Sequence, residues 1–351
     1  MDSVDFIVVG QGIAGTTLAW ALRWRGARVV VIDRAEAATA SRVAAGLITP
    51  VTGQRLAKTW RLEPLWAAAR AFYARVEAET QSSLLSELET VRLFQDTTER
   101  AAFVARVDTI LKGLVSGPDV PVNATWFDAP HGGFAMVPAG RLDVARYLQV
   151  SRDVFARDGG YFVGEIDPER DVELVAGGVR LPRFGIAARG IVFCQGFSAV
   201  SNPWFPRVPY NFAKGEILTL RVPGLAESRT IHRGVWFLPI GGETYLAGAT
   251  YERDALDCEP TPKGREELSA RLRSLLRLPF DVTGHVAAVR PIVQDQRPTI
   301  GVHPDHPQIG YFNGLGSKGS LQAPFVASQF ADFLTANGTI EREIDLARMT
   351  R

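Results

Sequence analysis

The first fifteen residues contain the feature that most constrains the fold. The segment VDFIVVG is an uninterrupted apolar run of strand length, and it leads directly into GQGIAG at residues 10–15. A parallel strand that is buried on both faces has this composition. In the G-x-G-x-x-G pattern, Gly10 makes a tight turn, Gly12 lets the backbone approach a pyrophosphate, and Gly15 lets a helix pack closely on a strand. The pattern predicts the start of a dinucleotide-binding unit.

The segments that follow the glycines complete this unit. IAGTTLAWALRWRG is predicted to form a helix whose N-terminus, at Ile13 and Ala14, faces the phosphates of the ligand. ARVVVID is predicted to form the next strand, and it ends at Asp33, where a carboxylate can accept hydrogen bonds from a ribose diol. This order of strand, glycines, helix, strand and acid favours a nucleotide site over a plain βαβ unit. It does not choose between NAD and FAD.

A second glycine loop, NGLGSKGS, repeats the same spacing at Gly314, Gly316 and Gly319. The following SLQAPFVASQFADFL has helical spacing and ends before an Asn-Gly pair, which is a good C-terminal signal. A complete second unit would need another strand with an acid, and only TIEREIDLARMTR remains. The helix N-terminus and Lys318 can instead offer positive charge to one anionic edge, such as that of a reduced flavin; the alternative is a solvated loop lysine. We therefore expect one cofactor, bound by both loops.

Composition restricts the possible functions. The chain has 351 residues, 46% of them hydrophobic and 22% charged, which is typical of a globular enzyme with two cores. Lys plus Arg number 39 against 38 for Asp plus Glu, so the net charge of +1 predicts no general attraction to nucleic acid or to an anionic membrane. The first strand begins near Val4 and leaves no room for a signal peptide, so we expect a cytoplasmic protein. The two cysteines lie far apart, and we expect no metal site and no disulfide framework.

Six segments, in order, resemble the D-amino-acid oxidase (DAO) family of FAD-dependent oxidoreductases. This family includes glycine oxidase, sarcosine oxidase and the oxidase half of a bifunctional tRNA wobble-uridine modification enzyme. The resemblance covers nearly the whole chain. The segments are VVGQGIAG with VVVID, SRVAAGLITP at 41–50, GIVFCQGFSA at 190–199, YLAGATYERD at 245–254, VRPIVQDQRPTIG at 289–301 and NGLGSKGSLQAP at 313–324.

The resemblance implies an α/β fold, with a Rossmann-type FAD-binding domain of the glutathione-reductase-like class. An interleaved α+β substrate domain, built on an antiparallel sheet, is expected beside it. The FAD-binding domain should be discontinuous and comprise residues 1–60, 137–212 and 286–351. The substrate domain should comprise residues 61–136 and 213–285, and LEPLWAAARAFYARVEAE and GREELSARLRSLLRL are predicted to be amphipathic helices within it.

Several further segments are expected to contact FAD. SRVAAGLITP collects small residues where the backbone can approach a flat ring, although a flexible loop is the alternative. GIVFCQG resembles the strand whose end covers the adenosine part of FAD, and Cys194 is expected to be a core residue there. Sarcosine oxidases attach FAD through a cysteine near the position of Arg290, and this sequence has none nearby, so noncovalent FAD is expected. The expected FAD-binding residues are Gly10, Gly12, Ile13, Ala14, Gly15, Asp33, Arg34, Ser41, Arg42, Ala45, Gly46, Leu47, Cys194, Gly196, Arg290, Gly314, Gly316, Ser317, Lys318 and Gly319.

Arg290 is the main candidate for substrate binding. It ends a predicted strand in VRPIVQDQRPTIG and resembles the arginine with which amino-acid oxidases of this family pair the substrate carboxylate. Guanidinium binds carboxylate through two parallel hydrogen bonds, although a structural ion pair is the alternative role. The segment RGVWFLPIGGETYLAGATYERD predicts a sheet with one face on a pocket. Trp236, Tyr245 and Tyr251 are its expected pocket residues, with packing inside the sheet as the alternative.

Three other positions bear on the chemistry. Arg297 is expected to pair with Asp295 or to face solvent, and His232 is the histidine nearest to the predicted pocket. Leu246 occupies the position where sarcosine oxidases carry a lysine that promotes reaction with oxygen. The electron acceptor, oxygen or another, therefore stays open.

We expect an FAD-dependent amine or amino-acid oxidase or dehydrogenase. Its substrate would be small, glycine-like or D-amino-acid-like, and would carry a carboxylate; hydride transfer to the flavin would leave an imine that water hydrolyses. The alternative is an RNA-modifying flavoenzyme similar to the wobble-uridine oxidase, against which the near-zero charge and the lack of a fused methyltransferase argue. An NAD(P)H-dependent reductase would need a second complete Rossmann unit, and in a non-catalytic flavoprotein Arg290 would have no evident purpose.

Overall fold

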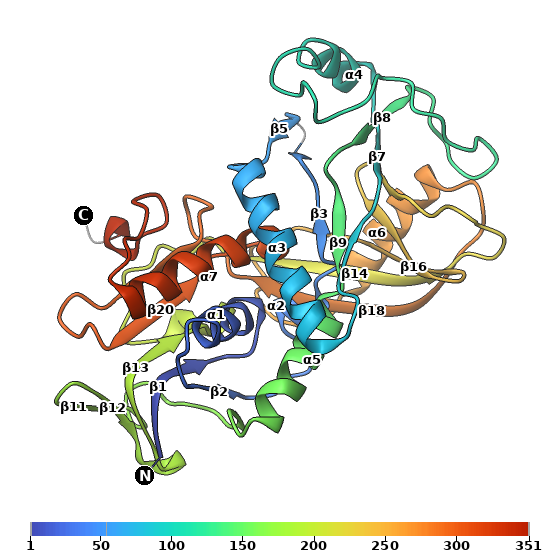
Figure 1. The fold of residues 1–351 in the computed structure, drawn as a ribbon. Helices are drawn as coiled ribbons and strands as arrows, with labels where there is room; N and C mark the ends of the chain where they lie inside the picture. The colour runs from blue at the N-terminus through green and yellow to red at the C-terminus, as the bar shows by residue number, and fades with distance from the viewer. Residues whose placement is uncertain (1, 54, 350–351) are drawn as a thin grey trace.

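The computed structural model describes residues 2–53 and 55–349, and this part of the chain contains two large sheets. Figure 1 shows the eight-stranded sheet at the lower left and the seven-stranded sheet at the right. Helices from distant parts of the sequence gather beside the first sheet.

The eight-stranded sheet contains the N-terminal unit. Its parallel strands are β10 (Tyr161–Val163), β2 (Val29–Asp33), β1 (Asp2–Val9), β13 (Ile186–Phe193) and β20 (Ile309–Asn313). Its antiparallel strands are β12 (Gly178–Leu181), β11 (Glu173–Val175) and β19 (Thr299–Val302). Successive side chains of a strand point to opposite faces, so Phe6 and Val8 enter one core while Ile7 and Val9 enter another. This is why the run FIVV has no polar alternation.

Four helices cover one face of this sheet and share its core. They are α1 (Ile13–Arg23), α3 (Leu62–Thr80), α5 (Val144–Arg157) and α7 (Gly319–Ala336). Buried hydrogen bonds join them: the hydroxyl of Tyr73 donates to the carbonyl oxygen of Ser320 at 2.9 Å, and Nε1 of Trp20 donates to Oγ of Ser151 at 2.9 Å.

Helix α3 therefore packs with the nucleotide-binding elements, whereas the sequence predicted it in the substrate domain. The apolar residues expected on one face, Leu65, Ala69, Phe72 and Val76, are buried, but against α7 and α5. The boundary expected at residue 61 does not mark a change of packing. The periodicity of a helix shows which of its faces is buried and does not show its neighbour.

The seven-stranded sheet has the order β18-β14-β17-β16-β15-β7-β8 and is antiparallel except between β15 and β7. Its strands are β18 (Asp281–Arg290), β14 (Ala213–Arg221), β17 (Thr244–Gly248), β16 (Trp236–Gly241), β15 (Thr230–His232), β7 (Thr90–Leu93) and β8 (Gly133–Met136). The boundary expected at residue 286 falls inside β18. Helix α6 (Pro262–Leu275) covers one face, where Leu268 and Leu272 pack against Leu218 and Phe237.

The remaining elements are short. The strands are β3 (Leu47–Ile48), β4 (Val51–Thr52), β5 (Ala57–Lys58), β6 (Leu85–Glu87) and β9 (Gly140–Leu142). The helices are α2 (Ala40–Val43), α4 (Thr97–Val104) and the 3-10 turns η1 (Pro182–Phe184), η2 (Gly196–Ser201) and η3 (Leu346–Met349). Figure 1 shows α4 beyond the outer ends of β7 and β8, far from β1.

The predicted fold class, a Rossmann-type domain with an interleaved sheet domain, is confirmed. Within the described residues, no helix combines the length and the apolar character needed to cross a membrane.

The packing of α1 on β1 gives a stability prediction. A Cβ atom on Gly15 would overlap the carbonyl oxygen of Gly10, whereas a Cβ atom on Gly117 would have open space. Gly15→Ala should therefore lower the free energy of unfolding by about 1–3 kcal/mol, the usual cost of overpacking a tight contact. Gly117→Ala is the control and should change it by less than about 0.5 kcal/mol. Equal effects in chemical denaturation would contradict the assigned role of Gly15.

Candidate functional site

Residues from both large sheets line one cavity of about 800 Å³. Both glycine loops open onto it, and they meet there: a Cβ atom on Gly319 would lie 3.0 Å from Cγ2 of Ile13. The N-termini of α1 and α7 are therefore neighbours at the same cavity. This arrangement fits one cofactor between the two loops.

Almost all of the expected FAD-binding residues line this cavity. The exception is Gly15, which packs against Gly10 behind the loop. The lining residues among those expected are Gly10, Gly12, Ile13, Ala14, Asp33, Arg34, Ser41, Arg42, Ala45, Gly46, Leu47, Cys194, Gly196, Arg290, Gly314, Gly316, Ser317, Lys318 and Gly319. Their contacts with a bound cofactor stay a prediction.

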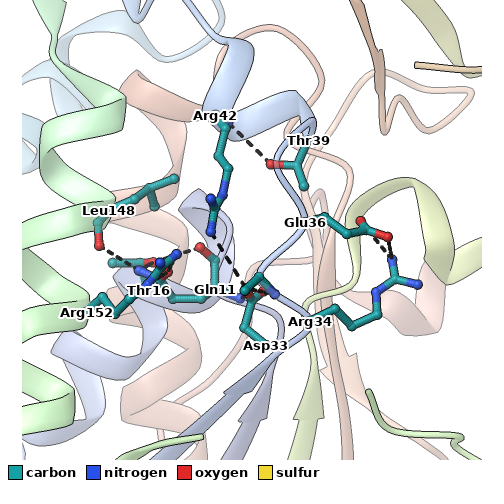
Figure 2. Close-up of polar contacts among 10 residues, drawn as sticks. Gln11, Thr16, Asp33, Arg34, Glu36, Thr39, Arg42, Leu148 and Arg152 are labelled. Atoms are coloured by element: carbon teal, nitrogen blue, oxygen red, sulfur yellow. Dashed lines mark hydrogen bonds and ion pairs between the residues drawn. The ribbon is translucent and has the colours of Figure 1, made fainter. Parts of the chain in front are cut away.

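Asp33 organises the loop at the start of α1. Its carboxylate accepts the backbone N–H of Gln11 at 2.7 Å and that of Ala35 at 2.8 Å, so it holds the ends of β1 and β2 together (Figure 2). The carboxylate also lines the cavity and keeps further acceptor capacity for hydroxyl groups. Its position suits the ribose role predicted for it.

Helix α2 brings two polar side chains to the first glycine loop. Oγ of Ser41 accepts the backbone N–H of Ile13 at 3.0 Å. Figure 2 shows the guanidinium of Arg42 directed toward Asp33, with Nη2 4.0 Å from Oδ1. Nη2 is buried and, within the described part of the chain, has no hydrogen-bond partner. A buried unpartnered donor beside a helix N-terminus suits an anionic dinucleotide.

Gln11 and Arg152 form a support for this loop that the sequence interpretation missed. Nε2 of Gln11 donates to the carbonyl oxygen of Leu148 at 2.7 Å, and Oε1 accepts from Nη2 of Arg152 at 2.9 Å (Figure 2). Leu148 and Arg152 lie on α5, so only the tertiary structure brings them to the fingerprint. Arg34, in contrast, pairs with Glu36 and Glu165 at the rim of the cavity.

At the other glycine loop, Lys318 is a partly buried cation. Its Nζ donates to Oγ1 of Thr59 at 3.1 Å and to Oγ1 of Thr52 at 3.2 Å. Burial, and secondly the charge of Arg297, lower the pKa of Lys318 to about 8. The alternative of a solvated loop lysine is therefore wrong, and the side chain lines the cavity beside the N-terminus of α7.

Arg297 lies on an aromatic ring. Its guanidinium is 4.6 Å from the ring centroid of Trp60. The expected partner, Asp295, accepts the backbone N–H of Arg297 but forms its ion pair with Arg348 at 2.8 Å.

One face of the seven-stranded sheet forms the opposite wall of the cavity. The pairing registers place a row of residues side by side on five adjacent strands, and every member of the row lines the cavity. The row is Ile217, Gly248, Trp236, His232 and Arg92. Trp236 packs over Gly248, where any Cβ atom would collide with the indole ring. Trp236 thus lies on the cavity side, as predicted.

Arg290 lies at one end of this wall. Its guanidinium covers Gly215 and makes three long hydrogen bonds of 3.4 Å, two to the carbonyl oxygen of Thr250 and one to that of Lys214. Its charge also lies 5.6 Å from the ring centroid of Tyr251. Within the described residues no carboxylate pairs with it, and burial lowers its pKa from the usual value. The structural ion pair considered as an alternative is absent from this part of the chain.

Tyr251 and Tyr245 lie in different environments: Tyr251 lines the cavity, and Tyr245 is in the core. Tyr251 is 56% exposed and lines the cavity between Arg290 and Arg253, whose guanidinium is 5.4 Å from its ring centroid. Tyr245 lies in the core on the other face of the sheet, stacked on Phe237, and its hydroxyl donates to the carbonyl oxygen of Leu225 at 2.8 Å. The expectation that Tyr245 is a pocket residue is therefore corrected: residues 245 and 248 point to opposite faces of β17.

The far end of the wall contains polar residues that the sequence interpretation largely missed. Thr90 and Arg92 on β7 lie beside Thr230 and His232 on β15, and all four line the cavity. Burial, and secondly the charge of Arg92, lower the pKa of His232 to about 3, so its imidazole is neutral at physiological pH. The alternation in TVRL, with polar residues at 90 and 92, is the signal that marks one face of this strand.

The two cysteines also differ. Cys194 is buried, burial raises the pKa of its thiol, and its carbonyl oxygen packs against Gly10, as expected for a core residue. Cys258 lines the cavity although it is distant from Arg290 in the sequence. A cysteine far from Arg290 in the sequence therefore still reaches the cavity.

Comparisons with known proteins agree with this arrangement. A family model described as "FAD dependent oxidoreductase" (DAO) matches residues 5–333. Glycine oxidase from Bacillus licheniformis is 25% identical over 95% of this chain and 93% of its own. The crystal structure of glycine oxidase from Geobacillus kaustophilus superposes with a TM-score of 0.80 at 21% identity, covering 99% of this chain and 98% of that one.

A second kind of relative is longer. The tRNA 5-methylaminomethyl-2-thiouridine biosynthesis bifunctional protein MnmC from Marinobacter nauticus is 24% identical over 98% of this chain. The match covers 58% of that protein, so this chain spans little more than half of its length.

The position of Tyr245 predicts that its substitution affects the stability of the protein and not its activity. Tyr245→Phe removes the donor to a buried carbonyl oxygen and should lower the free energy of unfolding by about 1–2 kcal/mol. The activity should stay unchanged because the ring is on the core face. Trp236→Phe, on the cavity face, is the matched variant and should alter the activity. A slow Tyr245→Phe enzyme of full stability would place Tyr245 in the reaction after all.

Proposed function

The chain belongs to the DAO family of FAD-dependent oxidoreductases, and from this membership we propose that it oxidises the C–N bond of a small amine or amino acid that carries a carboxylate. The observation that supports this substrate class is the Arg290 guanidinium, which faces the cavity without a carboxylate partner in the described chain. FAD, when bound, supplies the hydride acceptor.

A carboxylate ligand would remove an energetic penalty at Arg290. A buried charge is unfavourable unless it is paired, and three long contacts to carbonyl oxygens compensate for it only weakly. The nearby Lys214 is not an alternative anchor, because it is 1% exposed and paired with Asp257 at 2.5 Å. A planar carboxylate on the planar guanidinium would also orient the C–N bond of the substrate.

The cofactor would be held by both glycine loops. In this proposal Gly12 and the N-terminus of α1 receive the diphosphate, with Arg42 beside it, and Asp33 binds the ribose. Lys318 and the N-terminus of α7, which lies beside that of α1, would hold negative charge at another part of the same cofactor. The positive groups of the two loops match the anionic parts of one FAD.

The reaction needs little acid–base assistance from the protein. His232 is neutral and distant from Arg290 along the wall. If the amine binds uncharged, loss of hydride leaves an iminium ion, and water then converts that ion to a carbonyl compound and a protonated amine or ammonium. The residues Arg290, Trp236 and Tyr251 would position the substrate and shield it from solvent.

A second candidate function is the oxidation of an amine group on a tRNA. The match to the MnmC protein over nearly the whole of this chain supports it. The net charge of +1 argues against a large nucleic-acid surface. Reduction of the bound flavin by free amino acids would favour the first function, and reduction only by the modified tRNA would favour the second.

We expect the FAD to be bound noncovalently, although Cys258 lines the cavity. Acid precipitation of the yellow holoenzyme should leave a colourless pellet and release at least about nine-tenths of the flavin absorbance into the supernatant. A yellow pellet would contradict this expectation, and loss of that colour in Cys258→Ser would identify the attachment.

Arg290→Met should slow reduction of the flavin by carboxylate substrates and leave the FAD spectrum nearly unchanged. The expected loss in stopped-flow reduction is about 2–5 kcal/mol, the range for a desolvated charge that loses its partner. Arg290→Lys should fall between Met and wild type, because lysine keeps the charge but lacks the planar fork.

Amines without a carboxylate serve as the control, and they should react slowly and equally with wild type and Arg290→Met. Equal rates for both enzymes with one carboxylate substrate would refute the assignment. The carboxylate anchor would then be sought at Lys318, the other cavity cation without a carboxylate partner among the described residues.

A further inference from the structure

We propose that Arg152, an arginine on α5, sets how tightly the protein holds FAD, because it fixes the first glycine loop through the side chain of Gln11. Arg152 would be a positioning residue: it contacts Gln11 and is not among the residues that line the cavity. The inference goes beyond the proposed function. It concerns the affinity for the cofactor and does not depend on which amine is oxidised.

Gln11 is held at its backbone and at its side chain. It stands between Gly10 and Gly12 in the turn that leads from β1 into α1, and it is 2% exposed. Its backbone N–H donates to Oδ2 of Asp33 at 2.7 Å, and its Nε2 donates to the carbonyl oxygen of Leu148 at 2.7 Å. The glycines on both sides have no side chain. The amide of Gln11 therefore supplies the side-chain hydrogen bonds that hold this turn.

The amide of Gln11 meets two groups of opposite hydrogen-bonding character on α5. Leu148 and Arg152 are four residues apart, so they lie on one face of the helix. The carbonyl oxygen of Leu148 accepts from Nε2, whereas Nε and Nη2 of Arg152 donate to Oε1 at 3.1 and 2.9 Å (Figure 2). A carboxylate at position 11 could not donate to Leu148, and an apolar side chain could bind neither group. An amide satisfies both at once, and the guanidinium determines which way the amide faces.

Arg152 carries a charge that no carboxylate pairs within the described part of the chain. Its two hydrogen bonds go to the neutral Oε1 of Gln11, and its guanidinium lies 5.4 Å from the ring centroid of Tyr161. The adjacent Asp153 accepts from Gln149 instead. A hydrogen bond from a charged donor is about twice as strong as a neutral one, so Arg152 is a strong anchor for the loop. Its positive charge also favours an anion bound at that loop.

An anchored loop raises affinity because it has the bound conformation before the ligand arrives. Binding then loses less conformational entropy than it would with a mobile loop. Without Arg152, the buried Oε1 of Gln11 loses its charged donor, and the amide is free to turn or to leave α5. The backbone N–H groups at the start of α1 would then lose their fixed direction toward the diphosphate. We therefore expect weaker binding of FAD from a substitution outside the cavity.

Release of FAD from the purified holoenzyme tests this proposal. The holoenzyme is diluted in steps, free FAD is separated by ultrafiltration, and its fluorescence gives the Kd. Arg152→Met should raise the Kd about tenfold, which corresponds to one hydrogen bond from a charged donor. Arg146→Met is the matched control, because Arg146 lies on the same helix, is exposed, and donates from its side chain only to Oγ of Ser82 at 3.4 Å. It should leave the Kd within about twofold of wild type.

A double variant shows whether Arg152 acts through Gln11. Gln11→Met alone should raise the Kd for FAD at least as much as Arg152→Met does. Adding Arg152→Met to Gln11→Met should then raise the Kd by no more than about a further twofold, because the contact between the two residues is already lost. A general weakening of α5 would act independently of Gln11, and the two fold-changes would multiply.

Two results would overturn the proposal: equal Kd values for FAD in Arg152→Met and Arg146→Met, or fold-changes that multiply in the double variant. If Arg152→Met gives no folded holoenzyme, Arg152→Lys is compared with Arg146→Lys. Lysine keeps the charge but lacks the planar fork, so a rise in Kd of about two- to fivefold is expected, and equal values would again overturn the proposal. The measurement reads retention of FAD alone, so it stands whether or not Arg290 binds a carboxylate substrate.

Discussion

The contact between two helix N-termini organises this molecule. The start of α7 packs on the start of α1, with Gly319 against Ile13, although the two segments lie at opposite ends of the chain. The absence of a side chain at Gly319 leaves room for the side chain of Ile13, and the contact directs both helix dipoles toward the same cavity. The remaining elements are built around it: α3 and α5 cover the two helices, and the second sheet closes the cavity from the other side.

The cations at and near the cavity are of two kinds: some have a carboxylate partner in the protein and others have none. Lys214 and Arg92 have carboxylate partners and act as fixed parts of the protein. Arg290 and Lys318 are partly buried at the cavity, and their hydrogen bonds in the described chain go only to neutral oxygens. Burial without a counter-charge is unfavourable in the free protein. Anionic groups of a cofactor and a substrate are the natural way to offset that cost.

Along each strand of the seven-stranded sheet, successive side chains alternate between the core face and the cavity face. One face carries Phe237 and Tyr245 into the core beneath α6, and the other carries Trp236 and His232 to the cavity. A shift of one residue along a strand therefore changes the role of a side chain completely. This is why an aromatic-rich segment identified the sheet correctly and still placed one of its tyrosines on the wrong face.

The sequence by itself determined the nucleotide-binding unit and the second glycine loop, because these features depend on local rules: glycines at fixed spacing, a buried strand and an acid at its end. Arg290 was singled out by the resemblance to the family, and its role stays a prediction. The sequence did not determine the neighbours of α3, the support of Gln11 by α5, the approach of Cys258, or the meeting of Thr90 and Arg92 with Thr230 and His232. These contacts join segments far apart in the chain, and periodicity shows which face of an element is buried without showing its partner. The tertiary structure alone decided them, since strands such as β7 and β15 pair across a long separation in the chain.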